Sequence, residues 1–395
     1  MSITTVGTKV GTGSAVEKDS KEAGRKAAQS AWDKIGRPRV DLAIVFAASK
    51  YRYADVLAGV KGVIGAAPLA GCSTAGEFCD GLVSDGAVVV MLVHSGGAKF
   101  SVGLGKDLKA RSFDAVQAMF GQFAPAPGKD FPHRSVLMLS DGLAGNGEQL
   151  VINAALKAGK EAFIAGGAAG DGGAFKETFL FHNDQVHSDA VVAIEMWSSS
   201  APGIGVSHGW CPSKFSGVVT KAKGNLLQEI DGKPAFQLYE QYAKAIKYPL
   251  TPQNSDMFMM TNELGMDLGP NKVKVRAPIK RNADGSILLA TEVPAQMKVS
   301  IVEGKCDSLL AAAKTAAEQA MAGLKGAKPA GVIVFDCIAR KICLKEDFQK
   351  EVEVIRKVVG NVPVIGFNTY GEIARVPGQF SGFHNTTDVV FIIPA

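Results

Sequence analysis

VIGAAPLAGCSTAGEF (63–78) and VVGNVPVIGFNTYGEI (358–373) align without a gap, although 295 positions separate them. Seven of the sixteen positions are identical, namely Val63/Val358, Gly65/Gly360, Pro68/Pro363, Gly71/Gly366, Thr74/Thr369, Gly76/Gly371 and Glu77/Glu372. A looser third copy, AFIAGGAAGD (162–171), again ends in a glycine followed by an acid. Solenoid repeats, with periods of about 20–50 residues, do not describe this spacing. The sequence therefore predicts two related halves.

Each copy of the glycine-acid loop lies in an alternation of apolar runs and helical segments. Leu42–Ala48, Ser135–Ser140 and Gly331–Cys337 are apolar runs of strand length, and each leads to a helical segment and a glycine-bearing turn. Because strands that are buried on both faces show as continuous apolar runs and alternate with helices, this pattern predicts an α/β fold. We expect two related domains with mixed or mostly parallel sheets flanked by helices.

The predicted organisation along the chain has three parts. Residues 1–16 are rich in Gly, Thr and Ser and predict a flexible arm. Helical spacing follows at Ala23, Ala27, Ala31, Trp32 and Ile35, which predicts a helix over 17–35. We therefore expect an N-terminal arm and helix over 1–38, a first domain over 39–215 and a second domain over 216–395.

Composition is typical of a folded globular protein and excludes several functions. The chain has 395 residues, of which 47% are hydrophobic and 21% charged, with a formal net charge of +5. The sequence has no basic run with interleaved aromatics, and its first residues lack the basic start and apolar stretch that a secretory signal would show. Its apolar runs are far shorter than the roughly 20 residues that span a bilayer. Its six cysteines form no CxxC pair. We expect a soluble, cytoplasmic protein with neither nucleic acid nor membrane as a partner.

With these motifs placed, the chain resembles the FIST family of bacterial sensory proteins, which contain an N-terminal and a C-terminal FIST domain. GCSTAGEF (71–78) is similar to the N-terminal signature. The C-terminal domain is similar at LLQEIDGKPAFQLY (226–239), VRAPIK (275–280), DGSILLATEVPAQMKV (284–299), FDCIAR (335–340) and IGFNTYGEIA (365–374). The resemblance covers roughly residues 40–390.

The resemblance implies small-molecule sensing and signal transduction rather than catalysis. The implied ligand is either haem, which would give a nitric oxide sensor, or an amino acid or similar metabolite without haem. We expect signalling through a separate partner such as a histidine kinase or a cyclic-di-nucleotide enzyme. A cysteine-dependent hydrolase or transferase using Cys337 or Cys72 is the alternative, although the GxSxG, GxxxxGK[ST] and HExxH motifs are absent.

The candidate ligand-binding residues lie in the glycine-acid loops. Glycine lets a ligand approach the main chain, and α/β proteins usually bind ligands beyond strand ends. The candidates are Ser73, Thr74 and Glu77 in the first copy, Asp171 in the looser copy, and Asn368, Thr369, Tyr370, Gly371 and Glu372 in the last copy. The alternative is a tight turn whose glutamate caps neighbouring amides.

Arg340 and Cys337 are further candidates, because they lie at and just beyond the end of a predicted strand. An arginine can hold a carboxylate through two parallel hydrogen bonds. Arg340 together with Glu372 would therefore suit a zwitterionic amino acid, and Arg340 would equally suit a haem propionate. An Arg–Glu bridge within the protein is the alternative. Cys337 is expected at the pocket rim, as a buried thiol rather than a nucleophile.

Haem would require an axial ligand in an apolar cavity. His182 occurs in a Phe-His-Asn setting that recurs at 383–385, and His208 lies near the presumed domain junction. These two histidines are the candidate iron ligands. The chain has no CxxCH motif, so any haem would be bound non-covalently.

Overall fold

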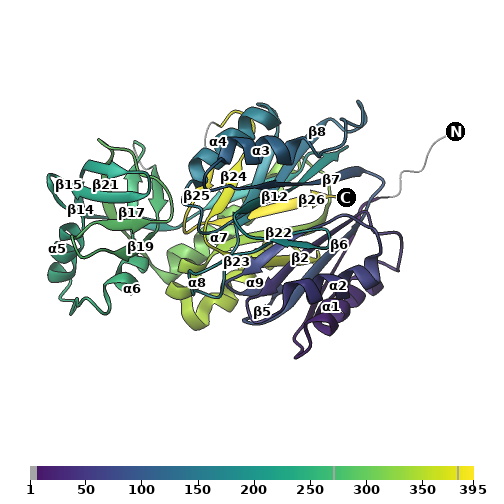
Figure 1. Ribbon diagram of the computed structural model, residues 1–395, viewed down its shortest axis with the longest axis horizontal. Coiled ribbons are helices and arrows are strands. Elements are labelled where there is room, and N and C mark those ends of the chain that lie inside the picture. The colour runs from purple at the N-terminus through teal and green to yellow at the C-terminus, as the bar shows by residue number, and fades with distance from the viewer. Residues whose placement is uncertain (1–6, 270–271, 380–381) are drawn as a thin grey trace.

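Three mixed six-stranded sheets of one shared topology form the core of the protein (Figure 1). The structure is a computed structural model and describes residues 7–269, 272–379 and 382–395. Each sheet contains one parallel pair of central strands, between an antiparallel pair on one side and a hairpin on the other. The predicted α/β class, with mixed sheets and flanking helices, is confirmed.

The strands of the three sheets follow in spatial order. The first sheet contains β1 (Lys9–Ala15), β6 (Val88–His94), β2 (Leu42–Ala48), β3 (Leu69–Thr74), β10 (Leu180–His182) and β11 (Gln185–His187). The second contains β7 (Ala98–Lys106), β12 (Ala190–Ser198), β8 (His133–Ser140), β9 (Phe163–Ala168), β24 (Glu372–Arg375) and β25 (Phe383–His384). The third contains β13 (Gly203–Ser207), β26 (Asp388–Pro394), β22 (Pro329–Cys337), β23 (Val364–Thr369), β4 (Glu77–Cys79) and β5 (Leu82–Ser84).

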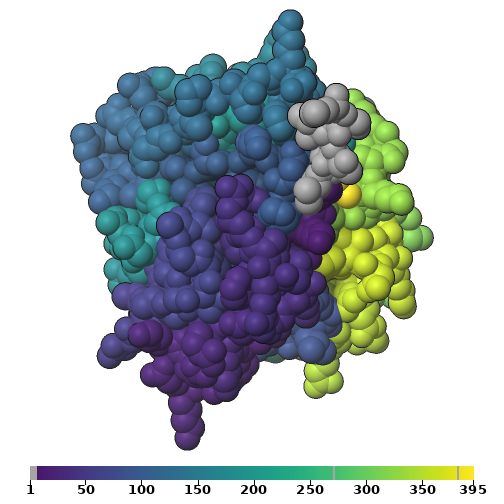
Figure 2. All heavy atoms as spheres, turned by 90° about the vertical axis from the view of Figure 1, so that its right-hand side faces the viewer, coloured from purple at the N-terminus to yellow at the C-terminus, as the bar shows by residue number. Residues whose placement is uncertain are grey.

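Each sheet is built mainly by one repeat of the chain, and each repeat contributes its hairpin to another sheet. Strand β4 of the first repeat pairs with β23, β10 of the second pairs with β3, and β24 of the third pairs with β9. The sequence predicted two related halves, but the structure has three equivalent units, and the looser third copy (162–171) lies at β9 in the second of them. Figure 2 views the core from the end opposite the lobe and shows the purple, blue and yellow-green repeats as adjoining sectors.

Helices cover the outer face of each sheet. They are α1 (Ser20–Lys34) and α2 (Tyr53–Ile64) on the first, α3 (Ser112–Phe120) and α4 (Gly147–Ala158) on the second, and α7 (Cys306–Gly323), α8 (Ile338–Leu344), η1 (Lys345–Asp347) and α9 (Phe348–Val359) on the third. The inner faces share one apolar core, to which Phe46, Phe335 and Phe367 belong. The strands are apolar on both faces because one faces helices and the other faces this core.

The N-terminal segment differs from the prediction. Strand β1 pairs antiparallel with β6, so the expectation of a flexible arm is wrong for Lys9–Ala15, and residues 1–6 lie outside the described residues. The glycines of β1 allow close packing against α1 rather than flexibility. A Cβ on Gly11 or Gly13 would come well inside 3.0 Å of a backbone oxygen of α1. The predicted helix that follows is confirmed as α1, which Asp19 caps at its N-terminus.

An inserted lobe, residues 210–304, separates β13 from α7 and projects from one end of the core (Figure 1). Its elements are β14 (Trp210–Lys223), β15 (Leu226–Ile230), β16 (Lys233–Pro234), α5 (Gln237–Ala245), α6 (Ser255–Met260), β17 (Asn262–Asp267), β18 (Val273–Arg276), β19 (Pro278–Arg281), β20 (Ile287–Leu289) and β21 (Lys298–Gly304). The lobe has an apolar core of its own. Within the described ranges, no helix has both the length and the apolar character needed to cross a bilayer.

Candidate functional site

The three glycine-acid loops meet where the parallel strand pairs of the repeats end. We call them the first loop (73–77), the second loop (167–171) and the third loop (368–372). Backbone hydrogen bonds join them in a ring, from Ala75 N–H to Asn368 O (3.0 Å), from Tyr370 N–H to Ala168 O (3.1 Å) and from Gly170 N–H to Ser73 O (3.0 Å). The sequence prediction that these loops are equivalent therefore extends to their position in space.

In the first loop, the Glu77 carboxylate is an internal hydrogen-bond acceptor. One oxygen accepts from the Thr74 hydroxyl, and the other accepts from the N–H groups of Gly86 (3.1 Å) and Ala87 (2.9 Å). Burial raises the pKa of Glu77, and these hydrogen bonds oppose that effect. This arrangement is the amide-capping turn that the sequence left open as an alternative.

The third loop repeats this arrangement. Glu372 accepts from the Thr369 hydroxyl with one oxygen, and from the Thr387 N–H (3.0 Å) and hydroxyl (2.8 Å) with the other. The side chain is fully buried, and burial raises its pKa to about 7. Gly371 lies against the Phe383 ring, where a Cβ would come within 2.5 Å of Cζ. Both glutamates thus have a role within the fold.

The second and third loops contact each other through Asp171 and Tyr370. The Tyr370 hydroxyl donates to the Asp171 carboxylate, which also accepts the N–H groups of Phe175 (2.8 Å) and two following residues. The Tyr370 ring stacks on Phe175 with centroids 4.4 Å apart. Burial acts to raise the pKa of Asp171, but the hydrogen bonds outweigh it and the pKa is lowered. Ser73 is engaged similarly, since its hydroxyl donates to Gly170 O (2.7 Å).

A cavity of about 550 Å³ opens beside the first loop, and we call it the loop cavity. Its wall combines the ends of β2 and β3 with the exposed face of α8 from the third repeat. The polar side chains in this wall are Ser49, Lys50, Thr74, Asp85, Lys341 and Lys345. Glu77 also lines it, so two of the predicted residues, Thr74 and Glu77, border the cavity. The lysines and Asp85 were not predicted, because a lysine or aspartate after a strand or on a short helix carries no motif.

Three polar groups converge above Gly76 in the cavity wall. A Cβ at this residue would lie 2.6 Å from Asn368 Oδ1, 2.6 Å from Lys341 Nζ and 2.9 Å from Asp85 Oδ1. Gly76 has φ +140°, which disfavours other residues, so glycine keeps this space clear. Lys341 and Asp85 form an ion pair with each other.

Asn368 is the predicted residue whose environment most favours ligand contact. The side chain is fully buried, and neither of its amide atoms has a hydrogen-bond partner among the residues that the structure describes. A buried amide without a partner is costly, and buried polar groups are nearly always paired. Because its Oδ1 lies close to Gly76 and Lys341, a polar group bound in the loop cavity is the natural partner.

Arg340 lies on the opposite side of α8 from the cavity and is fully buried. Its guanidinium donates to Glu351 and contacts Asp388 (2.7 Å), while Asp336 lies 3.8 Å away. The expectation that Arg340 and Glu372 hold one zwitterionic ligand together is not supported, because Arg340 faces the helix layer of the third sheet, whereas Glu372 belongs to the second sheet and accepts from Thr369 and Thr387. The contacts are those of the intramolecular bridge that was the alternative.

The cysteines and histidines give little support to the other predicted chemistries. Burial raises the pKa of Cys72 and Cys337 well above the usual thiol range, which favours the unreactive thiol over the thiolate. His208 uses both ring nitrogens within the protein: Nδ1 accepts from the Trp210 N–H (3.0 Å), and Nε2 lies 3.1 Å from Val273 O. His182 is half-buried on β10 and is not in the wall of the loop cavity. His208 also lines another cavity, of about 610 Å³, so a haem iron ligand stays a prediction.

Three α/β units that enclose a polar cavity at their junction define a protein suited to binding a small molecule. The comparisons with known families agree with this class. The FIST N domain matches residues 41–233 and the FIST C domain matches residues 235–375. The chain therefore belongs to the FIST family, whose domains are generally small-molecule-sensing signal transduction domains.

Relatives are found in bacteria and archaea. An uncharacterized protein of Mycobacterium bovis and one of Mycobacterium tuberculosis are each 24% identical over 385 residues, covering 94% of this chain and 95% of theirs. An uncharacterized protein of Methanocaldococcus jannaschii is 34% identical over 88 residues, 22% of this chain and 17% of its own. A solved structure, cyanuric acid hydrolase from A. caulinodans, is 13% identical with a TM-score of 0.26, covering 49% of this chain and 71% of that one. That likeness is too weak to carry an argument.

Proposed function

We propose that this protein is a sensor whose small-molecule ligand binds in the loop cavity and that it signals through a separate protein partner. The observation that carries the proposal is the convergence of Asn368, Lys341 and Asp85 above Gly76. These groups offer one cation, one anion and one unpaired amide to the same small space.

The chemistry of the wall favours a ligand with both an acidic group and a hydrogen-bond donor. Lys50, Lys341 and Lys345 line the cavity together with Asp85 and the buried Glu77, so cationic side chains outnumber anionic ones in its wall. An anionic group would pair with the lysines. An ammonium or amide N–H would donate to Asp85 and to the Asn368 carbonyl oxygen. A free amino acid or a similar metabolite meets these requirements without haem.

Signalling in the proposal passes to a partner such as a histidine kinase or a cyclic-di-nucleotide enzyme. The sensory family and the raised pKa values of the buried thiols both support a non-enzymatic role. Haem with nitric oxide stays a prediction from the family resemblance. His208 lines another cavity, of about 610 Å³, but both of its ring nitrogens already have partners within the protein.

The test is a thermal-shift screen of the full chain against the twenty amino acids, small mono- and dicarboxylates, inorganic phosphate and haemin. A compound present at 100 times its Kd stabilises the native state by about 2.7 kcal/mol. We expect at least one amino acid or carboxylate to stabilise the wild type, and Lys341→Ala and Asn368→Ala each to weaken its binding at least tenfold.

Lys314→Ala is the matched control, because Lys314 is an exposed lysine paired with a glutamate on a helix remote from the cavity wall. It should bind the compound with wild-type affinity. The proposal is wrong if no compound binds. It is also wrong if the cavity variants and the control bind equally well. A saturable Soret band with haemin alone would instead favour the haem sensor.

A further inference from the structure

The helix that lines the loop cavity also holds both connections of the inserted lobe. On its cavity side, Ile338, Lys341 and Ile342 contribute to the wall, at the spacing of one helix face. On its buried side, Arg340 extends toward the base of the lobe. The helix α8 therefore stands between the proposed ligand and the lobe.

Arg340 donates hydrogen bonds to the two chain segments through which the lobe is attached. One acceptor is His208 O (2.7 Å), just before the chain enters the lobe at Trp210. The other is Leu309 O (2.9 Å), in the first turn of α7 just after the chain leaves the lobe. A single guanidinium thus links the entry and exit segments to each other and to the cavity helix.

The remaining partners of Arg340 fix its position rigidly. Glu351 on α9 and Asp388 on β26 hold the guanidinium from the core side, and the side chain is fully buried. Buried charged hydrogen bonds of this kind are strong, and their loss leaves uncompensated charge in the core. Any displacement of α8 must therefore move the two lobe connections or break these contacts.

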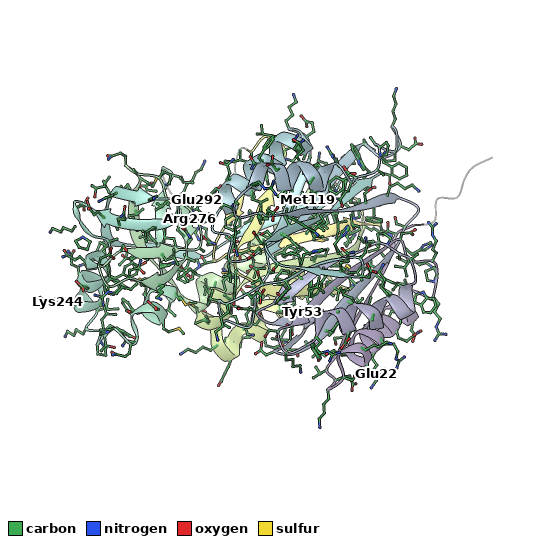
Figure 3. All side chains as sticks on the ribbon, viewed as in Figure 1. Glu22, Tyr53, Met119, Lys244, Arg276 and Glu292 are labelled. Carbon is green, nitrogen blue, oxygen red and sulfur yellow. The ribbon has the colours of Figure 1, made fainter. Side chains whose placement is uncertain are left out.

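The lobe can act as the moving part because it has its own core and projects from one end of the protein (Figure 1). Figure 3 shows Arg276 and Glu292 at the end of the lobe facing the core and Lys244 at the far end. Apart from its two connections, the lobe contacts the core through an apolar cluster that Val275 and Val302 share with residues of α7 and β22, and through polar links. Examples are Arg276 with Glu148, and Trp210 Nε1 with Thr386 O (3.1 Å).

We propose that occupancy of the loop cavity is transmitted to the inserted lobe through α8, with Arg340 as the link between the cavity helix and the lobe hinges. This inference rests on the proposed function for the ligand. The coupling between the cavity wall and the lobe does not itself depend on which ligand binds. Coupling between sites requires a contiguous set of contacts that both sites bias. The chain from the cavity wall through Arg340 to His208 and Leu309 supplies it.

A cavity-filling substitution can stand in for the ligand. Ala75 lies in the cavity wall, and the equivalent residue in the third repeat is Tyr370. Ala75→Tyr should fill part of the cavity and displace α8. Ala75→Leu is the smaller alternative if the tyrosine impairs folding. The readout is hydrogen exchange of the full chain at the hinge amides of Trp210 and Leu309, which donate to His208 Nδ1 and Lys305 O.

We expect Ala75→Tyr to raise exchange at both hinge amides at least fivefold in the wild-type background. In an Arg340→Lys background, the lysine cannot donate to both His208 O and Leu309 O as the guanidinium does. The Ala75→Tyr substitution should then change exchange less than twofold. Arg134→Lys is the matched control, because Arg134 likewise bridges a buried glutamate, Glu195, and a backbone carbonyl, but far from the hinges. In this background the fivefold effect should persist.

Two outcomes would overturn the inference. Either Ala75→Tyr leaves hinge exchange unchanged, or it raises exchange equally with and without Arg340. If Arg340→Lys does not fold, Glu351→Gln takes its place, since it removes one of the carboxylates that hold the guanidinium and leaves Arg340 itself unchanged. A failed ligand screen would refute only the proposed function, because the cavity-filling experiment contains no ligand.

Discussion

The buried carboxyl of Glu372 should make the stability of this protein fall as pH rises. Its pKa is raised from 4.5 to about 7 in the native state by burial, so the folded protein keeps the proton over a range where the unfolded chain releases it. Below about pH 4.5 both states are protonated and this contribution is fully present. As pH rises through about 7 the contribution is lost, and at 1.36 kcal/mol per pH unit the loss is about 3 kcal/mol.

Glu372→Gln isolates this effect, because the amide keeps the size of the carboxyl group and does not titrate. Its oxygen can still accept from Thr387 N–H, and the Thr369 hydroxyl can rotate to accept from the amide N–H. We expect urea unfolding to give similar free energies for the two proteins at pH 5. At pH 8 the variant should be the more stable by up to about 3 kcal/mol.

The comparison cancels the other buried acids, which titrate in both proteins. Glu318→Gln on α7 is the control, since Glu318 is exposed and pairs with the exposed Lys314. The control should follow the wild type at both pH values. Parallel stability curves for the wild type and Glu372→Gln between pH 5 and pH 8 would refute the reasoning and place the buried carboxylate in an environment that stabilises its charge.

Two other expectations follow from packing and burial. Gly105→Ala should lower the free energy of unfolding by about 2 kcal/mol or more in urea titrations, because its Cβ would collide with Ala115 O on α3; wild-type stability would contradict this. Cys211 and Cys306 are exposed, so both should react quickly with a chromogenic disulfide in the native protein. Cys72 and Cys337 are buried and should react only after unfolding. Rapid reaction of Cys337 in the native protein would instead support the cysteine-dependent enzyme.

The regular elements were predictable from the sequence because their signals are local. Continuous apolar runs gave β2, β8 and β22, and alanine spacing gave α1. The exchange of hairpins among sheets was not predictable from the sequence, because a short strand such as Glu77–Cys79 carries no information on which distant strand it will pair with. The prediction of a flexible arm at β1 was wrong for a related reason. Glycine marks both flexibility and close packing, and only the approach of α1 distinguishes them.

The sequence predicted where the loops lie better than it predicted which side chains line the cavity. The loops do meet at strand ends, and Thr74, Glu77 and Asn368 lie at or next to the loop cavity. Arg340 looked like a ligand-binding residue because it follows a strand. Its burial under α9 depends on helix packing that the sequence does not show. The neighbouring Lys341 reaches the cavity because it lies on the other face of the same short helix.

The repeats separate the residues that the fold needs from those that a ligand would need. The identical pairs are architectural: Thr74 with Glu77 and Thr369 with Glu372 make the same buried hydrogen bond. The same holds for Gly71 and Gly366. A Cβ on either would come inside 3.0 Å of the carbonyl oxygen of the neighbouring parallel strand. Identity between the copies therefore reports a constraint of the scaffold.

The residues that line the loop cavity, in contrast, differ between the repeats. By strand register, the position of Lys50 is occupied by Gly142 in the second repeat and by Ala339 in the third. Ala75 of the open cavity corresponds to Tyr370, whose ring is buried against Phe175 in the third loop. One junction thus has charged side chains and a small residue where another is filled by an aromatic ring. If binding depended on the shared glycine-acid loop, all three junctions would be equivalent. It is the unshared residues that distinguish the junction with the loop cavity, and substitutions among them should change ligand binding more than substitutions in the repeated motif.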